Sequence, residues 1–139
     1  YSGLTHYRAD ALSDLEADMR FFEPDFIQIN YSLGEHEADD HILPLAADMG
    51  IGVIVNRPYR QGALIRRFDG YDLPDWLSET GATNWAQFLL KFIIAHPAVT
   101  VVIPATRQVA HLRENNAAAR GPLPHRHHRR GRRLPDAAA

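Results

Sequence analysis

The sequence contains no cysteine among its 139 residues, and this absence removes several chemistries. No disulfide framework, thiolate metal site or cysteine nucleophile can form, which fits a reducing compartment, so we expect a cytoplasmic protein. The sequence also lacks the run of roughly 20 apolar residues that a membrane span needs, and its N-terminus lacks the basic and then apolar layout of a signal peptide. We therefore expect a soluble protein with no membrane partner.

Positive charge is scarce over most of the chain. The formal net charge is −2, but residues 125–139 hold five of the 15 basic residues and one of the 17 acidic ones, which leaves 10 basic and 16 acidic residues, or −6, in residues 1–124. Because nucleic-acid binding needs a positive face, this acidic body predicts no nucleic-acid partner. The His/Arg-rich tail is expected to be disordered, with nucleic-acid, acidic-surface or metal binding as alternatives.

Helical and extended patterns alternate along residues 1–124. The hydrophobic and charged fractions, 45% and 23%, are those of an ordinary globular domain. The periodicities predict helices over 8–22, 37–50 and 83–97 and from about residue 106 onward, and strands over 26–33, 51–56 and 99–104. Helices long enough to serve as crossovers imply parallel strands with the helices packed outside. We therefore predict an α/β fold.

Two patterns also predict which side chains are buried. In the strand over 26–33, Ile27, Ile29 and Tyr31 point to one face, while Gln28 and Asn30 point to the other. The helix over 83–97 carries a wide apolar stripe, for which core packing is expected: Trp85, Phe88, Leu89, Phe92 and Ile93. His96, at the end of this helix, is expected to interact with the terminal carbonyls.

The acidic stretch GEHEADDH, residues 34–41, is interpreted as the carboxylate-rich start of a helix. Glu37 and His41 have the helical i, i+4 spacing that a metal site uses, which is the alternative interpretation. Because no third ligand follows at a defined spacing, we predict no metal site.

The stretch IPATRQVAHLREN, residues 103–115, leads from an apolar strand into a polar helix start. If Thr106 caps this helix, Val109 and Leu112 pack inward and a separate polar face forms. The unpaired N–H groups of a first turn favour a phosphate, and Arg107 can add a bidentate contact. The alternative is an ordinary solvated helix face.

Several separated motifs resemble the C-terminal half of an aldo-keto reductase, and they occur in the same order. They are GLTHYR at the start, NYSL, the loop NRPYRQGAL, the strand VTVVIP and the segment HLREN. This resemblance implies that residues 1–124 form part of a TIM (β/α)8 barrel whose N-terminal half is absent. Such a half barrel leaves two sheet edges open, so self-association through these edges is also expected.

The resemblance implies two groups of residues that bind a nicotinamide cofactor. Thr5 and His6 stand where a Ser-Asn pair usually holds the nicotinamide amide, and Gln28 completes that site. Asn56 and Arg57 stand where many members have a stacking aromatic residue and then a serine, with Tyr59 in the same loop. The adenosine and ribose phosphate end of NADP(H) is assigned to Thr106, Arg107, Gln108, His111, Glu114 and Asn115.

Three features qualify what the resemblance implies. Ala105 replaces a lysine that often meets the 2′-phosphate and His111 replaces a common arginine, so NAD(H) remains an alternative cofactor. The catalytic Tyr, Lys, Asp and His of the family have no match, so no catalytic residue is assigned and the isolated chain is expected to be inactive. The implied function is the cofactor-binding half for NAD(P)H-dependent reduction of a small aldehyde or ketone; the alternative is a non-enzymatic half barrel that acts through association with another chain.

Overall fold

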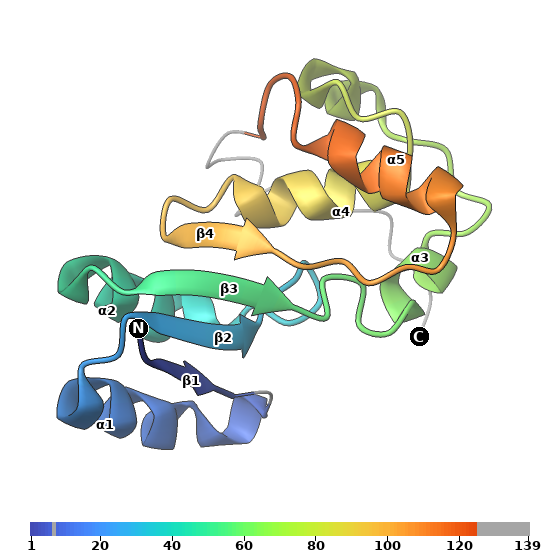
Figure 1. Cartoon of the computed structure of the whole chain (residues 1–139). Coiled ribbons are helices and arrows are strands. Elements are labelled where there is room, and N and C mark those ends of the chain that lie inside the picture. The colour runs from blue at the N-terminus through green and yellow to red at the C-terminus, as the bar shows by residue number, and fades with distance from the viewer. Residues whose placement is uncertain (7, 125–139) are drawn as a thin grey trace.

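The computed structural model describes residues 1–6 and 8–124, which form one sheet of four parallel strands with helices between them (Figure 1). The strands are β1 (Gly3–Thr5), β2 (Phe26–Asn30), β3 (Gly52–Asn56) and β4 (Val99–Val102), and they lie in this order across the sheet. The α-helices are α1 (Leu12–Phe22), α2 (Ile42–Met49), α3 (Ala63–Arg67), α4 (Trp85–Ile94) and α5 (Val109–Ala118). Three short 3₁₀ helices precede α1, α2 and α4: η1 (Ala9–Ala11), η2 (Glu37–Asp39) and η3 (Asp75–Thr80). The α/β prediction is confirmed.

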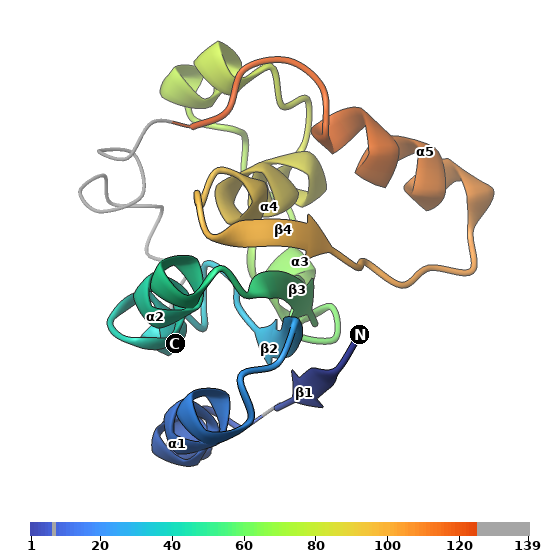
Figure 2. The ribbon, with the colours of Figure 1, turned by 60° about the vertical axis from the view of Figure 1, so that its left-hand side comes forward.

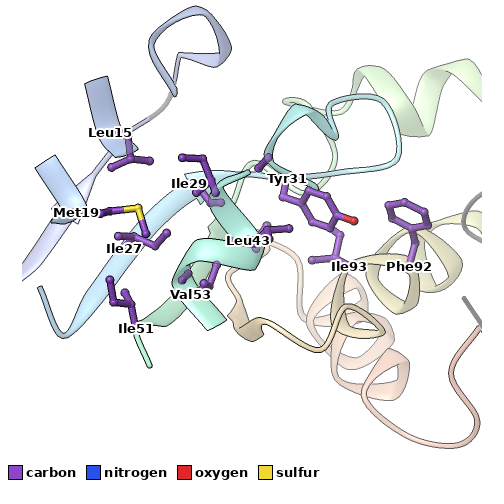
Figure 3. Packing of buried hydrophobic residues seen from close by; sticks show 14 residues of the cluster. Leu15, Met19, Ile27, Ile29, Tyr31, Leu43, Ile51, Val53, Phe92 and Ile93 are labelled. Carbon is purple, nitrogen blue, oxygen red and sulfur yellow. The ribbon is translucent and has the colours of Figure 1, made fainter. Parts of the chain in front are cut away.

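The helices α1, α2 and α4 lie on the same side of the sheet, which curves around the opposite side (Figure 2). On the helix side, Ile27 and Ile29 of β2 are buried, as their alternation predicts. They pack with Leu15 and Met19 of α1 and with Leu43 of α2 in one continuous core (Figure 3). Removing this apolar surface from water stabilises the contact between sheet and helices.

A second core lies between α3, η3 and α4. The α4 residues Trp85 and Phe88 pack there, and the Trp85 ring stacks on Phe68 with centroids 4.2 Å apart. Phe92, on the same helix, packs instead in the first core, where its ring stacks on Tyr31. The predicted apolar stripe of α4 is therefore confirmed as core packing, and α4 joins the two cores.

The predicted helices begin later than the sequence pattern indicated, and a 3₁₀ turn takes up the difference before α1 and α2. α1 starts at Leu12, after the η1 turn, and α2 starts at Ile42, after η2. Pro44 then occupies the first turn of α2, where its missing N–H removes no intrahelical hydrogen bond. α2 ends at Met49 and is capped by Gly50, whose φ of 70° lies in the left-handed region.

His96 lies just after α4, and its main-chain N–H donates to the Ile93 carbonyl oxygen at 3.0 Å, as predicted, but its imidazole ring has other partners. Its Nδ1 accepts a hydrogen bond from the Ala98 N–H at 3.1 Å, and its Nε2 lies 3.2 Å from Asp39 Oδ1. The buried Tyr31 hydroxyl donates to the same Asp39 oxygen at 3.0 Å. A carboxylate of the acidic stretch therefore connects the end of β2 with the end of α4, a contact between elements that no local pattern contains.

No helix in the described part of the chain combines the length and apolar character needed to cross a membrane.

We expect Ile29→Ala to lower the free energy of unfolding by about 2–5 kcal/mol, because it removes a side chain that is 1% exposed and leaves a cavity between β2 and α1. Urea unfolding followed by circular dichroism measures this change. Phe21→Ala is the control, since Phe21 is 79% exposed and its loss is expected to change stability by less than about 0.5 kcal/mol. Equal effects of the two substitutions would contradict the assignment of the core.

Candidate functional site

The loops that follow the four strands meet at one edge of the sheet, because all the strands run in the same direction (Figure 1). At this carboxyl edge Thr5 pairs with Gln28, and Asn30 pairs with Asn56. The strand pairing thus aligns three of the residues that the sequence assigned to a cofactor: Thr5, Gln28 and Asn56.

The loop after β3 has a backbone that ordinary residues rarely adopt. Arg57, Arg60 and Gln61 have φ angles of 47°, 48° and 56°, in the left-handed region. Such conformations are costly for residues with a Cβ and are concentrated at binding sites. Beside them, the Asn56 Oδ1 atom is buried and has no hydrogen-bond partner. This loop therefore combines backbone strain with an unsatisfied acceptor.

Tyr59 connects the same loop to α5. Its hydroxyl donates to Asn115 Oδ1 at 2.8 Å and also lies 3.3 Å from the Ala86 carbonyl oxygen. Burial, and then the negative charge of Glu114, raise the pKa of Tyr59 well above its ordinary value. The phenol is therefore neutral at physiological pH and serves as a hydrogen-bond donor.

The final helix begins at Val109 and not at Thr106. Gln108 is the N-cap, and the Thr106 Oγ1 accepts a hydrogen bond from the Gln108 N–H at 3.1 Å. Thr106 therefore shapes the turn before α5 and does not cap the helix. No side chain caps α5 itself, and Arg107, Gln108 and His111 are exposed around its start. Uncapped N–H groups beside a guanidinium are an arrangement that binds anions.

The prediction that Val109 and Leu112 pack inward is wrong, since these side chains are 64% and 50% exposed. α5 packs against α4 instead, through the face that carries Glu114, Asn115 and Ala118. The Asn84 Nδ2 donates to Glu114 Oε1 at 3.4 Å. Two residues assigned to the cofactor, Glu114 and Asn115, therefore have protein partners, and we infer that they hold the helix in place.

His6 is held at the end of β1. Its main-chain N–H donates to the Gln28 carbonyl oxygen at 2.8 Å, and its Nε2 lies 2.9 Å from the Ala11 carbonyl oxygen. Since a carbonyl only accepts, Nε2 carries the proton in this contact. The ring lines a small hollow at the ends of β1 and β2, together with side chains that include Arg8, Asn30 and Glu35.

A polar network that the sequence did not reveal lies beside this hollow. The Asn30 Nδ2 donates to Glu35 Oε1 at 3.0 Å, and the Arg60 Nε lies 3.9 Å from Glu35 Oε2. Glu35 thus joins the end of β2 to the loop after β3. The position of Glu35 in the acidic stretch was the only sign in the sequence that it has a polar role, but that stretch was interpreted as the start of a helix. Among the described residues, no three His, Cys, Asp or Glu side chains gather where they could hold a metal ion.

Comparisons with known proteins agree with this architecture. Residues 1–134 match the family model described as the aldo/keto reductase family. The chain belongs to the aldo/keto reductase family. The domain boundary at residue 124 and the disorder of the basic tail at 125–139 remain predictions, since the tail lies outside the described residues. A search of curated protein sequences found no match.

Solved aldo-keto reductases share the fold. The holo form of a Bacillus halodurans enzyme is 18% identical with a TM-score of 0.63, and the match covers 89% of this chain and 46% of that one. A Klebsiella pneumoniae enzyme in complex with NADP and acetate is 23% identical with a TM-score of 0.64, covering 88% and 43%. The chain therefore spans about half the length of these proteins, and its fold is part of a TIM barrel.

We expect Tyr59→Phe to lower the free energy of unfolding by about 1–2 kcal/mol at neutral pH, because it leaves the Asn115 oxygen without its donor. The pH dependence of this difference is a sharper test. In the unfolded chain Tyr59 ionises near its ordinary pKa of 10.0, whereas burial keeps it protonated to higher pH in the folded protein. Its contribution is therefore complete below pH 10 and is lost as the pH rises further.

Urea titrations of both proteins at several pH values measure this difference. The stability of the two proteins should converge above pH 10, where ionisation in the unfolded state begins to favour unfolding of the wild type. A difference that stays constant through this range would show that Tyr59 is not buried as a neutral donor.

Proposed function

We propose that the chain supplies the cofactor-binding part of an NAD(P)H-dependent oxidoreductase that reduces small aldehydes or ketones. Membership of the aldo/keto reductase family supports the reaction class. The observation that carries the proposal is the uncapped start of α5, with Arg107, Gln108 and His111 exposed around it at the carboxyl edge. The cysteine-free composition supports the cytoplasm as the location.

The residues at this edge fit a dinucleotide. The buried Asn56 Oδ1 needs a donor, and an amide N–H of a nicotinamide is a suitable one. Thr5 and His6 lie at the end of β1 and Gln28 lies in the middle of β2, where they would orient the same amide, and Arg57 would contact the phosphates. Bound nicotinamide would supply the hydride. The chain's own residues would fix the position of the ring and of the phosphates, and we assign none of them to proton transfer.

The adenosine end is assigned to the start of α5. Arg107 offers a planar pair of donors to a phosphate, and the first N–H groups of α5 add a partial positive charge. Gln108 and His111 lie within the same turn and would contact the ribose, while Thr106 would fix the turn. One similar structure contains NADP, which favours NADP(H), with NAD(H) as the alternative because Ala105 offers no charge.

A second candidate function is non-enzymatic association with another chain. It is favoured by the β4 edge, where Val101 and Ile103 are 43% and 46% exposed, close in sequence to the exposed Val109 and Leu112 of α5. Among the described strands, β1 and β4 each pair on one side only. Open edges of this kind promote strand pairing between chains, and a second copy would supply such a strand.

We expect the chain to bind 2′,5′-ADP, the adenosine end of NADP, and Arg107→Gln to weaken this binding by about 10- to 100-fold, as the loss of a charge-assisted bidentate contact should. Isothermal titration calorimetry measures both constants. Arg20→Gln is the control, because it removes the same charge from the exposed face of α1 and should leave the affinity unchanged. Failure of the wild-type chain to bind 2′,5′-ADP or NADPH would contradict the proposed function.

A further inference from the structure

Lys91 is a lysine of α4 whose side chain is buried, with 1% exposed. Its Nζ donates to the carbonyl oxygens of Arg120 and Pro122, at 2.5 Å and 3.0 Å. Both acceptors lie just beyond the end of α5, which packs beside α4 in Figures 1 and 2. A buried ammonium is costly unless it is hydrogen-bonded, so these two contacts fix the side chain in place.

The electrostatics of two helix ends favour this position. Lys91 lies in the last turn of α4, and its ammonium reaches the chain immediately after the last turn of α5. The C-terminal ends of both helices carry partial negative charge, and a cation placed there is stabilised by both. Burial lowers the pKa of Lys91, while the two carbonyl oxygens and the helix ends act in the opposite direction and favour the charged form.

The turn that presents the two carbonyls depends on Gly121. Its φ of 75° lies in the left-handed region, where a residue without Cβ is favoured. A Cβ built at Gly121 would lie 4.0 Å from the Lys91 Nζ, with no closer atom around it. Gly50, at the end of α2, has nearly the same φ, 70°, and no atom within 4 Å of such a Cβ. The chain thus offers two comparable glycines, of which one belongs to the Lys91 contact.

The hydrogen bonds described above between α5 and its neighbours lie in the second half of the helix or just beyond it. Asn115 accepts from Tyr59, Glu114 accepts from Asn84, and Ala118 is 1% exposed. Val109 and Leu112, in the first half, are exposed and add little packing. The first half of α5 therefore projects from attachments in its second half and in the turn that follows the helix.

The geometry points to Lys91 as a positioning residue: its contacts with the Arg120 and Pro122 carbonyls fix the far end of α5 and so set where Arg107 and the first N–H groups of this helix lie. A helix of about ten residues is about 15 Å long, so a tilt of about 10° at one end moves the other by about 2.5 Å. A displacement of 1 Å can cost a positioned group about 100-fold in effect. The expected effect of Lys91 on ligand binding rests on the proposed function, whereas its role in the placement of α5 does not.

Hydrogen–deuterium exchange of the whole chain without ligand tests the placement. Lys91→Met keeps the apolar stem and removes the ammonium, and we expect amides 109–121 to exchange at least about 10-fold faster while those of α1 and β2 change less than about twofold. Lys91→Arg should restore much of the protection, because a guanidinium also donates to two carbonyls. Because Met keeps most of the apolar volume of Lys, rescue by Arg would reflect the restored charge and donors.

Gly121→Ala and Gly50→Ala form a second, matched comparison for the case in which Lys91→Met unfolds the chain. Both place a Cβ at a positive φ, so their general cost should be similar. Only Gly121→Ala should accelerate exchange of amides 109–121. Equal exchange of these amides in the two variants, or unchanged exchange in Lys91→Met, would overturn the inference.

Affinity for 2′,5′-ADP separates this inference from the proposed function. We expect Lys91→Met to weaken binding by about 10-fold and Lys91→Arg to keep it within about threefold of the wild type. If the wild-type chain does not bind 2′,5′-ADP but Lys91 still controls exchange in α5, the proposed function fails and the positioning role of Lys91 is supported. If the wild type, Lys91→Met and Lys91→Arg all bind 2′,5′-ADP with the same affinity, the positioning role is refuted and the proposed function is kept.

Discussion

Parallel pairing of the strands is the constraint on which the rest of the structure depends. β2 and β3 pair without interruption from Phe26 opposite Gly52 to Asn30 opposite Asn56. Because parallel strands must be joined by crossovers, the helices cover one face of the sheet and every loop that follows a strand lies at the same edge. Asn56 and the start of α5 therefore share an edge, although more than 50 residues separate them in the sequence. The candidate site follows from the direction of the strands.

The first two helices, α1 and α2, and the last helix, α5, are stabilised in different ways. α1 and α2 bury apolar side chains against β2 and β3, in a core that includes Met19, Ile29 and Leu43. α5 instead depends on hydrogen bonds from Tyr59, Asn84 and Lys91, together with packing of Ala118. Hydrogen bonds contribute less net stability than an equivalent apolar contact, so α5 is expected to open more readily than the sheet. Elements at binding sites are commonly drawn from this less stable part of a protein.

The sequence predicted three of the four described strands, and the buried faces of β2 and α4, because these depend on local periodicity. Ile27, Ile29 and Tyr31 are buried as expected, and so are Trp85, Phe88 and Phe92. It failed where the outcome depends on a neighbour distant in sequence. Periodicity places Val109 and Leu112 together on α5, but it does not say that α4 meets the opposite face. The contacts of His96 with Asp39 and of Lys91 with Arg120 also join residues from separate elements. The candidate cofactor residues follow from the resemblance to a family. The physical properties of residues 103–115 alone are equally compatible with an ordinary solvated helix face.

The negative charge of the body does not argue against an anion site at the carboxyl edge. Residues 1–124 carry a net −6, but at physiological ionic strength charges farther apart than about 8 Å are largely screened. The charged and polar groups near the start of α5 therefore determine whether an anion binds there. Near the start of α5 these include the exposed Arg107 and the N–H groups of an uncapped first turn. The carboxylate of Glu114, on the same helix, accepts a hydrogen bond from Asn84, which orients it toward α4 without removing its charge. The proposed anion site therefore depends on Arg107 and on the first N–H groups of α5, and not on the net charge of the chain.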